Sequence, residues 1–501
     1  MMGYSTNRPF VKVDVTGEVD KRFGEVTSQL AETAWNNTLN YGRVRFRSDF
    51  NSQGIELVRG VDGKIQHNVD TNFNADNYQL TIYFDTNWGD DITGAGTVGS
   101  PYKTLGKSFK KASESASKKI KVVGKGKLFR EESYSYDWFP NFINKTIYLV
   151  GANEDGTNLV ISNAQSSERV GGYATTNYPL VWVSYNAIWK TSRSLTGNVV
   201  DLKNQDFYGI GKPLSNVSNL IDCESTLNSY YINGSDVYVN TFNSQKPDDN
   251  LLVCPYSTLF KLKLDNSRFI VENCDFYGGV NLQYDGTCHV DGDINSTFIA
   301  KNCRASGGNL TIIDSASSNY QTTTNAFGIR DVGLVMFFEC KTGYVRRDGF
   351  NYHYYNTSAT DVLDCLVFEY KCVGHETGYN GGSTNNQFST MHEGANILRV
   401  DCVGHDTGGA CIVDIGGSRS VLVDCHMGAS KIQTASSLST GYRFFSADSS
   451  GYAVLISCNA NGSTWAITGS IDFPVTIKDG FKAIDKIKDV ALTTEQEQTA
   501  T

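Results

Sequence analysis

Ionisable side chains of the kind that perform acid–base chemistry gather in one part of the 501-residue chain. Five of the seven histidines fall there, and several carboxyl groups lie between them. These residues are His353, His375, His392, His405, His426, Asp348, Glu376, Glu393, Asp406 and Asp414. Imidazole and carboxyl groups are the usual general acids and bases of enzymes, so we predict that this region carries a catalytic or binding site.

A short motif repeats within this region. Residues 373–378 read Val-Gly-His-Glu-Thr-Gly, and residues 403–408 read Val-Gly-His-Asp-Thr-Gly. If these are equivalent positions of stacked coils, His375 faces His405 and Glu376 faces Asp406 about 4.8 Å away. Like charges at that distance raise the pKa of at least one carboxyl group, which is one way to obtain a general acid near neutrality. The alternative is a stacked surface turn with no chemistry.

Two carboxyl groups would do the chemistry, one as acid and one as base or nucleophile. Our first candidates are Asp348 and Glu393, with His353 and His392 orienting groups or transferring protons. Asp348 could instead order a corner as an Asx turn. Residues 381–395 are rich in Gly and Asn and predict an inserted loop, which carries His392 and Glu393.

The second pair of candidate carboxyl groups is Asp406 and Asp414. Neighbouring coils would place two carboxyl groups near the retaining separation of about 5–5.5 Å. Groups two coils apart, such as Asp348 and Asp406, would sit about 9.6 Å apart and suit inversion.

Candidate substrate-binding residues surround these groups: Arg346, Arg347, Tyr352, Glu376, His375, His405 and Tyr379. The arginines could equally be solvated, and the tyrosines could pack in the core or between chains. Eliminative cleavage is the nearby alternative reaction, with His392 as base and Arg347 neutralising a substrate charge. We predict no bound metal ion and no cofactor, although the Asp-rich residues 285–293 leave Ca²⁺ as an alternative.

A repeated cysteine predicts the scaffold that brings these residues together. Seven short apolar strands each end at a cysteine followed by a Gly- or Asn-rich turn. The cysteines are Cys274, Cys303, Cys340, Cys372, Cys402, Cys425 and Cys458. Steps of 23–37 residues are typical of a right-handed parallel β-helix with insertions in its turns. A small apolar side chain packs well on copies of itself, so we expect free, buried thiols rather than disulfides.

The rest of the chain completes an all-β solenoid. We expect a helical attachment stem in residues 1–40, a small β-rich module in 41–98 and a capping helix in 99–119. The β-helix itself would occupy 120–475, and 476–501 would form a short tail. In this interpretation, segments such as GNVVDLKNQDFYGIG and SDVYVNTFNS are strands of the solenoid.

Composition limits the partners. The net charge of −9 disfavours nucleic acid and anionic lipid. No stretch approaches the length of apolar sequence that spans a membrane, so we expect no membrane insertion. The sequence begins without a secretory signal, so we expect synthesis in a reducing cytoplasm.

The segment DTNWGDDITGAGTVGSPYKTLGKSFKKA, at residues 85–112, resembles bacteriophage tailspikes and other pectate-lyase-like β-helix proteins. Those proteins share a Gly- and Asp-rich turn, a Ser-Pro-Tyr/Phe-Lys-Thr segment and a capping helix before the solenoid. The resemblance implies a homotrimeric tail protein of the virion, made in the host cytoplasm. It also implies N-terminal attachment to the virion and recognition, and often cleavage, of a bacterial surface polysaccharide.

Three functions follow from this interpretation. The first is a tailspike depolymerase that cuts a capsule or O-antigen by endo-glycosidic hydrolysis, with a polysaccharide lyase of the same fold as its alternative. The second is a non-catalytic glycan-binding appendage. The third, a free-standing bacterial lyase, is disfavoured by the missing signal and by the apolar stripe of a helical stem in residues 17–35.

Overall fold

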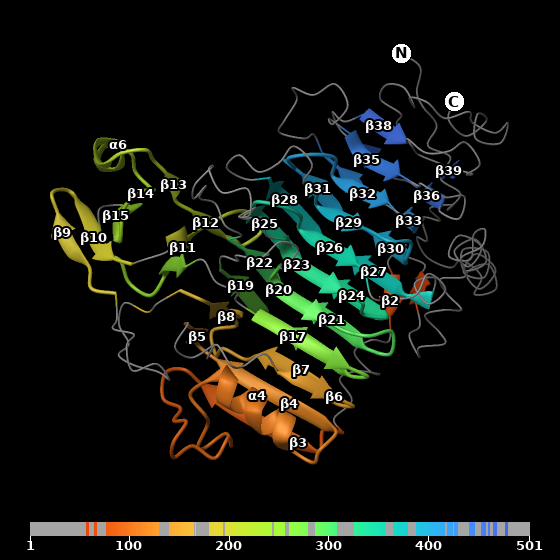
Figure 1. Cartoon of the computed structure of the whole chain (residues 1–501), viewed down its shortest axis with the longest axis horizontal. Helices are drawn as coiled ribbons and strands as arrows, with labels where there is room; N and C mark the ends of the chain where they lie inside the picture. Colours follow the sequence, from red (N-terminus) through yellow and green to blue (C-terminus); the bar gives the residue numbers. More distant parts are fainter. Residues whose placement is uncertain are drawn as a thin grey trace, which may run out of the picture.

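The fold is a parallel β-helix built from three sheets that run the length of the molecule (Figure 1). The computed structural model describes residues 77–129, 140–164, 166, 180–193, 196–242, 245–255, 260–278, 286–307, 325–355, 364–378, 387–415, 418–423 and 425–428. It also describes the backbone of strands β1, β2 and β35 to β39. The solenoid and all-β class predicted from the cysteine repeat are confirmed.

Each coil contributes one strand to each sheet. Sheet 1 has eleven strands among the described residues, in the order β3 (Leu80–Asp85), β4 (Lys119–Lys125), β7 (Thr146–Gly151), β18 (Arg268–Glu272), β21 (Thr297–Lys301), β24 (Leu334–Phe338), β27 (Leu366–Tyr370), β30 (Asn396–Val400), β33 (Arg419–Val423), β36 (Tyr452–Ile456) and β39 (Thr476–Lys478). Sheet 2 follows it in each coil, with β5 (Lys127–Leu128), β8 (Leu159–Ser162), β19 (Cys274–Tyr277), β22 (Arg304–Ser306), β25 (Lys341–Val345), β28 (Val373–Thr377), β31 (Val403–His405), β34 (His426–Met427) and β37 (Asn459–Ala460). Sheet 3 closes the coil, with β6 (Asn141–Ile143), β17 (Phe260–Asp265), β20 (Gly286–Asp291), β23 (Asn325–Arg330), β26 (Phe350–His353), β29 (Ser389–Met391), β32 (Ile412–Ile415), β35 (Thr440–Phe445) and β38 (Thr464–Ile467).

The cysteines form the predicted column between sheets 1 and 2. The carbonyls of Cys303, Cys340, Cys372 and Cys402 each accept a backbone hydrogen bond from the following coil. The residue before the cysteine has a φ of 46° to 55° in five coils, at Asn273, Asn302, Glu339, Lys371 and Asp401. This left-handed residue turns the chain sharply, and the small thiol then fits inside the corner. All eleven described cysteines are buried and free; Cys458 lies outside the described residues.

A helix closes one end of the core. Helix α4 (Leu105–Glu114) begins after Thr104, whose hydroxyl accepts a hydrogen bond from the Lys107 amide at 3.0 Å. Its Phe109 packs against Phe142 and Phe269 at ring distances of 5.5 and 5.9 Å. The apolar face of α4 therefore covers the first coils, as Figure 1 shows at the lower end of the solenoid.

The solenoid begins earlier than the sequence predicted. Strand β3 was expected in a separate N-terminal module, but it pairs in parallel with β4 and is the first strand of sheet 1. Its alternating apolar pattern is the same in either setting, so only the pairing distinguishes them. At the other end, β39 extends sheet 1 to Lys478. Strands β1 (Leu57–Arg59) and β2 (Ile65–His67) form an antiparallel pair, and the predicted stem in residues 1–40 lies outside the described residues.

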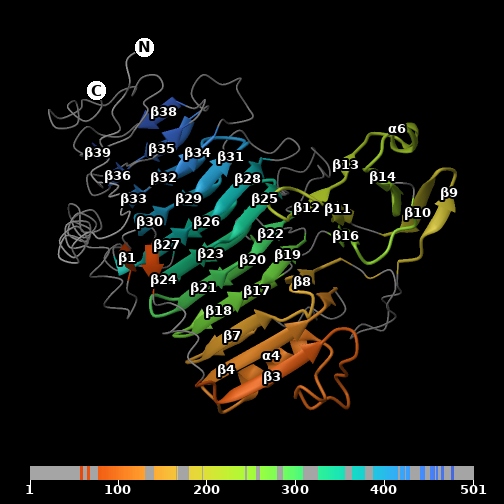
Figure 2. The ribbon, with the colours of Figure 1, turned by 180° about the vertical axis from the view of Figure 1, so that it is seen from behind.

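Residues 180–255 are not part of the solenoid, which corrects a second expectation. Sheet 2 passes directly from β8 to β19, and the described residues between β8 and β17 form an insert with mainly antiparallel pairing. Its elements are β9 (Val183–Tyr185), β10 (Ile188–Ser192), β11 (Thr196–Gln205), β12 (Gly211–Pro213), β13 (Ser215–Asn216), α6 (Leu220–Ser225), β14 (Ser229–Asn233), β15 (Asp236–Asn240) and β16 (Leu251–Pro255). Both views show the insert projecting from one side of the stacked coils (Figures 1 and 2). The Asn-Gly turn between β14 and β15 is a strong hairpin signal that favours this arrangement.

Candidate functional site

The turn between β11 and β12 brings the insert onto the outer face of sheet 2. Asp206 shapes this turn by accepting hydrogen bonds from the amides of Tyr208 and Ile210, at 2.8 and 2.9 Å. The Lys341 amine donates to the Tyr208 carbonyl at 3.3 Å, and the Gly211 amide donates to the Tyr277 hydroxyl at 2.9 Å. The side chains of the turn are therefore held at fixed positions over β25, β28 and β31.

Under this turn lie the two histidines of the repeated motif. His375 and His405 are register partners in β28 and β31, and their rings stack at 5.4 Å. The glycine before each histidine is required by the interior, because a Cβ on Gly374 or Gly404 would lie 2.2 or 2.9 Å from the Phe388 ring. The Tyr208 ring lies 5.1 Å from His375 and 5.6 Å from His405. Three rings, two from adjacent strands of sheet 2 and one from the insert, thus meet at one place.

A hydrogen-bonded chain runs through this place. The Asp406 carboxylate lies 2.8 Å from His405 Nδ1, and His405 Nε2 lies 2.8 Å from the Tyr208 hydroxyl. With a proton on Nδ1 shared with Asp406, Nε2 accepts the tyrosine proton. Burial, reinforced by the charges of Asp206 and Asp406, raises the pKa of Tyr208, so its hydroxyl is protonated at neutral pH. The chain can pass a proton between Tyr208 and His405.

The second histidine has its own carboxylate. His375 Nε2 lies 3.0 Å from the Asp206 carboxylate. Burial alone would raise the pKa of Asp206, but the contact with His375 and the turn amides hold that pKa below its usual range. Asp206 therefore stays ionised while it fixes both the turn and His375.

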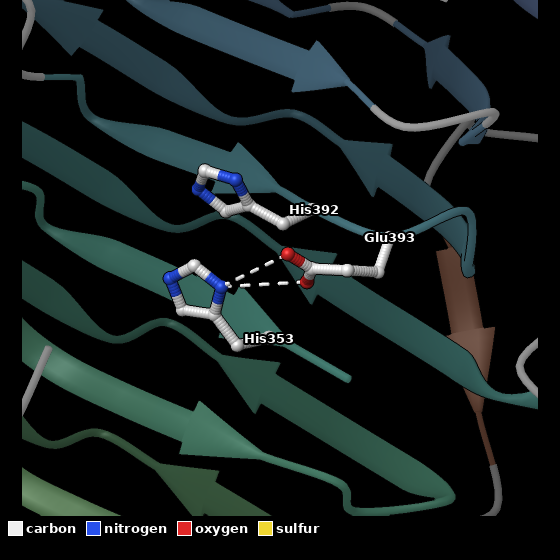
Figure 3. A group of neighbouring side chains, drawn as sticks. All are labelled: His353, His392 and Glu393. Carbon is white, nitrogen blue, oxygen red and sulfur yellow. Dashed lines mark hydrogen bonds and ion pairs between the residues drawn. The ribbon is translucent and has the colours of Figure 1, made fainter. Parts of the chain in front are cut away.

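A further group forms where sheet 3 turns toward sheet 1. His353 ends β26, and His392 and Glu393 follow β29 (Figure 3). The predicted inserted loop is wrong at Ser389–Met391, which form β29 and pair with β26 and β32 in sheet 3. The His353 and His392 rings stack at 4.1 Å, and His353 Nδ1 lies 3.3 Å from the Glu393 carboxylate. Tyr355, half exposed, stacks on His353 at 4.7 Å. Burial, with His353 nearby, lowers the pKa of His392 to about 3. We call His353, His392 and Glu393 the His–Glu cluster.

Three of the predicted site residues lie inside the coil, where a polymer cannot reach. Asp348 is buried at a corner, and its two oxygens accept hydrogen bonds from the Gln387 amide and the Asn351 side chain, at 2.8 and 2.9 Å. Tyr352 is fully buried and donates to Glu369 at 2.8 Å. The turn-ordering alternative for Asp348 therefore fits its contacts, and we do not assign either residue to substrate.

Asp414 is also interior. It accepts hydrogen bonds from both terminal nitrogens of Arg399 at 2.8 and 2.9 Å, and both residues are fully buried. Arg399 also lies 3.5 Å from Glu369. Asp414 therefore serves a buried ionic network of the core. Because Asp348 and Asp414 are interior, each predicted carboxyl pair keeps only one member that reaches solvent, Glu393 in the first and Asp406 in the second.

The remaining predicted residues have mixed positions. Glu376 follows His375 as Asp406 follows His405, and both carboxyl residues have a φ of 51°. Arg346 and Arg347 follow β25 and are partly exposed. Tyr379 lies outside the described residues.

Asp206 and Tyr208 were missed by the sequence analysis, because the segment that carries them was taken for a solenoid strand. The Asp-Phe-Tyr-Gly tetrad at residues 206–209 was the available signal, since Asp and Gly mark a turn and two aromatic residues would then be displayed at its tip. The structure bears this out, since Phe207 is 95% exposed.

Comparison with known proteins gives only distant similarities. No protein-family profile and no curated protein sequence matches the chain. Among solved structures, a complex of XylC with xylose has a TM-score of 0.36 at 10% identity over 79% of this chain and 71% of its own. Pectate lyase Pel9A has a TM-score of 0.32 at 11% identity, covering 83% and 81%. The Gp54 tailspike of Acinetobacter baumannii bacteriophage AP22, in complex with a capsular saccharide, has 0.25 at 10%, covering 76% and 62%. Similarities at these TM-scores assign no function to the chain.

Proposed function

We propose that the protein is a tailspike-type polysaccharide depolymerase that binds and cleaves a bacterial surface glycan. The observation that carries this proposal is the hydrogen-bonded chain Asp406–His405–Tyr208 on the outer face of sheet 2. A neutral proton donor that is hydrogen-bonded to an oriented imidazole can break a glycosidic bond by acid–base catalysis. The outer face of a long parallel sheet is a surface along which a linear polymer can lie.

Elimination is the reaction that these groups fit best. The Tyr208 oxygen takes the proton on the carbon beside a uronate carboxyl group, while its own hydroxyl proton passes to His405. The electron pair forms a carbon–carbon double bond, and the glycosidic oxygen leaves. That oxygen receives a proton from Tyr208, which regains one from His405, so the site returns to its starting state. Asp406 keeps His405 in the productive tautomer throughout.

Exposed groups around the chain are suited to holding sugar. Phe207 is 95% exposed, and its ring lies 5.3 Å from that of Tyr208 at an interplanar angle of 82°. An exposed aromatic ring beside the reacting hydroxyl can stack on a sugar face, which fixes the polymer near Tyr208. Glu376 then remains a candidate binding residue, as the sequence predicted. His375 is buried against Asp206, and His405 belongs to the proposed proton-transfer chain.

Hydrolysis is the second candidate, and the register of β28 and β31 favours it. Glu376 and Asp406 occupy equivalent positions of adjacent coils, directly after the paired histidines. Their backbones are therefore about 4.8 Å apart, near the carboxyl separation of retaining glycosidases. In that case Asp406 would be nucleophile and Glu376 the acid.

The biological setting that we propose is a phage tail. Its support is the resemblance of residues 85–112 to tailspikes, and the contacts of that segment give the resemblance a physical reason. Asp91 accepts hydrogen bonds from the amides of Lys103 and Thr104 and from the Thr104 hydroxyl, at 2.9, 3.1 and 2.6 Å. This network places the start of α4 over the core. We therefore propose a homotrimer carried on the virion through its N-terminal region, with capsule or O-antigen as the receptor.

The test is cleavage of purified capsules and O-antigens from a bacterial panel, followed by sizing and ultraviolet absorbance of the products. We expect shortened chains with a new double bond, and a loss of about 10²–10⁴-fold in rate for Tyr208→Phe. Tyr185→Phe removes a hydroxyl elsewhere in the insert and should leave the rate unchanged.

The other outcomes separate the alternatives. Shortened chains without a double bond, together with incorporation of oxygen from labelled water, would identify hydrolysis. Binding without shortening would identify a glycan-binding appendage. If Glu393→Gln abolished cleavage while Tyr208→Phe kept it, the catalytic centre would be the His–Glu cluster, as the sequence first predicted.

A further inference from the structure

We propose that the His–Glu cluster is a binding site for a divalent transition-metal ion of the zinc type. The sequence predicted no metal, because it contains no His-Glu-x-x-His motif and no two cysteines separated by two residues, and His353 lies 39 residues before His392. Folding brings the three together from adjacent coils. This site lies at the corner of sheets 3 and 1, so it is independent of the proposed glycan-cleaving chain on sheet 2.

The donor atoms are close to the geometry that such an ion needs. One ligand atom from each residue lies within 4.8 Å of the other two. Bonds of about 2.0–2.2 Å place the ligand atoms of a tetrahedral ion about 3.4 Å apart. His353 Nδ1 and the Glu393 carboxylate are already 3.3 Å apart. The remaining adjustment falls to Glu393, whose side chain is 34% exposed and can rotate, and to the His392 ring. This ring stacks on His353 at an interplanar angle of 18° and must turn, because the nitrogen lone pair that binds an ion lies in the plane of the ring.

The site is built by the fold. The His392 amide donates to the Tyr352 carbonyl at 3.1 Å, which holds the end of β29 against β26. Glu393 has a φ of 60°, and its carboxylate accepts a hydrogen bond from the Tyr354 amide at 3.1 Å. This turn directs the carboxylate back toward the two rings, as Figure 3 shows.

Neighbouring groups select which nitrogens face the ion. The Thr390 hydroxyl lies 3.3 Å from His392 Nε2. A metal-binding histidine commonly gives its other ring N–H to an oxygen, so this contact leaves Nδ1 as the ligand nitrogen. His353 presents Nδ1 as well, toward Glu393. Tyr355 covers the opposite face of His353 and limits rotation of its ring.

The ligand types indicate which ions would bind. Two imidazoles and one carboxylate form the set found in catalytic zinc sites, with a position left for water. Ca²⁺ and Mg²⁺ prefer oxygen ligands only and would bind weakly. The positive charge of Arg347 disfavours a cation at His392, and the negative charge of the Glu393 carboxylate offsets this effect. The bound ion would tie β26 to the segment after β29.

The experiment uses the full chain without a histidine tag, treated with chelator and dialysed. Titration with Co²⁺ and Zn²⁺ is followed by calorimetry and by the visible absorption of cobalt. We expect one ion per chain, a cobalt spectrum of low coordination number, a higher Tm with Zn²⁺, and no such effect of Mg²⁺.

Three variants locate the ion. Glu393→Gln, His392→Ala and His353→Ala should each weaken binding more than 10-fold and abolish the cobalt spectrum. Glu393→Gln keeps the shape of the partly exposed side chain, so a folded variant is available. His426→Ala removes a partly exposed histidine from sheet 2 and should bind like the parent. Absence of cobalt binding by the parent, or equal binding by Glu393→Gln and the parent, would overturn the proposal.

Discussion

At the residue scale, carboxyl side chains have different roles depending on whether they point out of the coil or into it. Asp406 faces outward and orients His405, whereas Asp414, eight residues later, faces inward and binds Arg399. Glu369 also points inward, and burial raises its pKa. Asp414 points inward as an alternating residue of β32, whereas Asp406 lies just after β31, where its φ of 51° interrupts the alternation.

The buried ionic network gives a prediction about stability. Arg399→Met leaves the carboxyl groups of Glu369 and Asp414 buried without their cation. We expect a loss of about 3–5 kcal/mol in the free energy of unfolding at pH 7. Burial already raises the pKa of Glu369, and without Arg399 its folded pKa lies further above its unfolded value. The variant is therefore penalised least below about pH 4 and most once the pH has risen through the folded pKa of Glu369.

Unfolding of the variant at pH 4.5 and pH 7 checks this. The triple variant Glu369→Gln, Asp414→Asn, Arg399→Met removes the charges together and should recover part of the loss at pH 7. A deficit of the same size at both pH values would contradict this account of the network.

At the element scale, the insert contributes to the site through one turn. The β11–β12 turn is held over sheet 2 by contacts from Arg304, Lys341 and Tyr277. Gly209 in this turn has a φ of 77°, and a Cβ there would lie 2.4 Å from the Arg304 guanidinium. A side chain at residue 209 would therefore displace the Arg304 guanidinium, whose hydrogen bond to the Gly209 carbonyl helps to hold Tyr208 in position.

Substitution of that glycine separates an effect on the position of the β11–β12 turn from an effect on the stability of the insert. We expect Gly209→Ala to displace the turn and to lower cleavage at least 10-fold. Gly234→Ala is the matched control, because Gly234 also has a positive φ of 60° but open space around it. Both variants should lose about 1 kcal/mol of insert stability, and only the first should lose activity. Equal rates for the two variants would remove Tyr208 from the proposed mechanism.

The cysteine column makes a second prediction at this scale. Burial raises the pKa of Cys372, in the column, to about 11 and that of Cys254, in β16 of the insert, to about 12, and a thiol reacts as its thiolate. We expect the eleven described cysteines to resist Ellman's reagent at pH 8 in the native protein. In guanidinium chloride all twelve thiols should react. Rapid native reaction of several thiols would show that the column opens in solution.

At the scale of the whole molecule, the long stacked coils leave extended faces available to partners. No helix among the described residues combines the length and apolar character needed to cross a membrane. Of the large apolar side chains that the described residues expose, seven belong to the insert, including Phe207, Ile221 and Phe242. Apolar exposure concentrated in one subdomain is typical of a contact surface.

Oligomeric state is the prediction for this scale. We expect a homotrimer, with three times the chain mass of 55.1 kDa, by light scattering after size-exclusion chromatography. Ile221→Lys, on α6 of the insert and 76% exposed, should weaken assembly if the insert contributes to it, whereas Lys110→Ala on α4 should not. A monomer of full length and normal fold would revive the free-standing lyase.

The solenoid could be predicted from the sequence because its strongest signal is local and repeated. Each of these coils contains an apolar strand, one cysteine and a turn. The cysteine column and the pairing of His375 with His405 could therefore be predicted from the spacing of the repeat. The contacts of residues 206–209, 353 and 392–393 could not be predicted from their spacing in the sequence. Only the tertiary structure determines them. The insert folds back over sheet 2 and adds Tyr208 to His405, while adjacent coils bring His353 to Glu393. The physical reason is that a repeat fixes neighbours one coil apart, whereas the path of an insert and the inward or outward direction of each side chain depend on packing between distant segments.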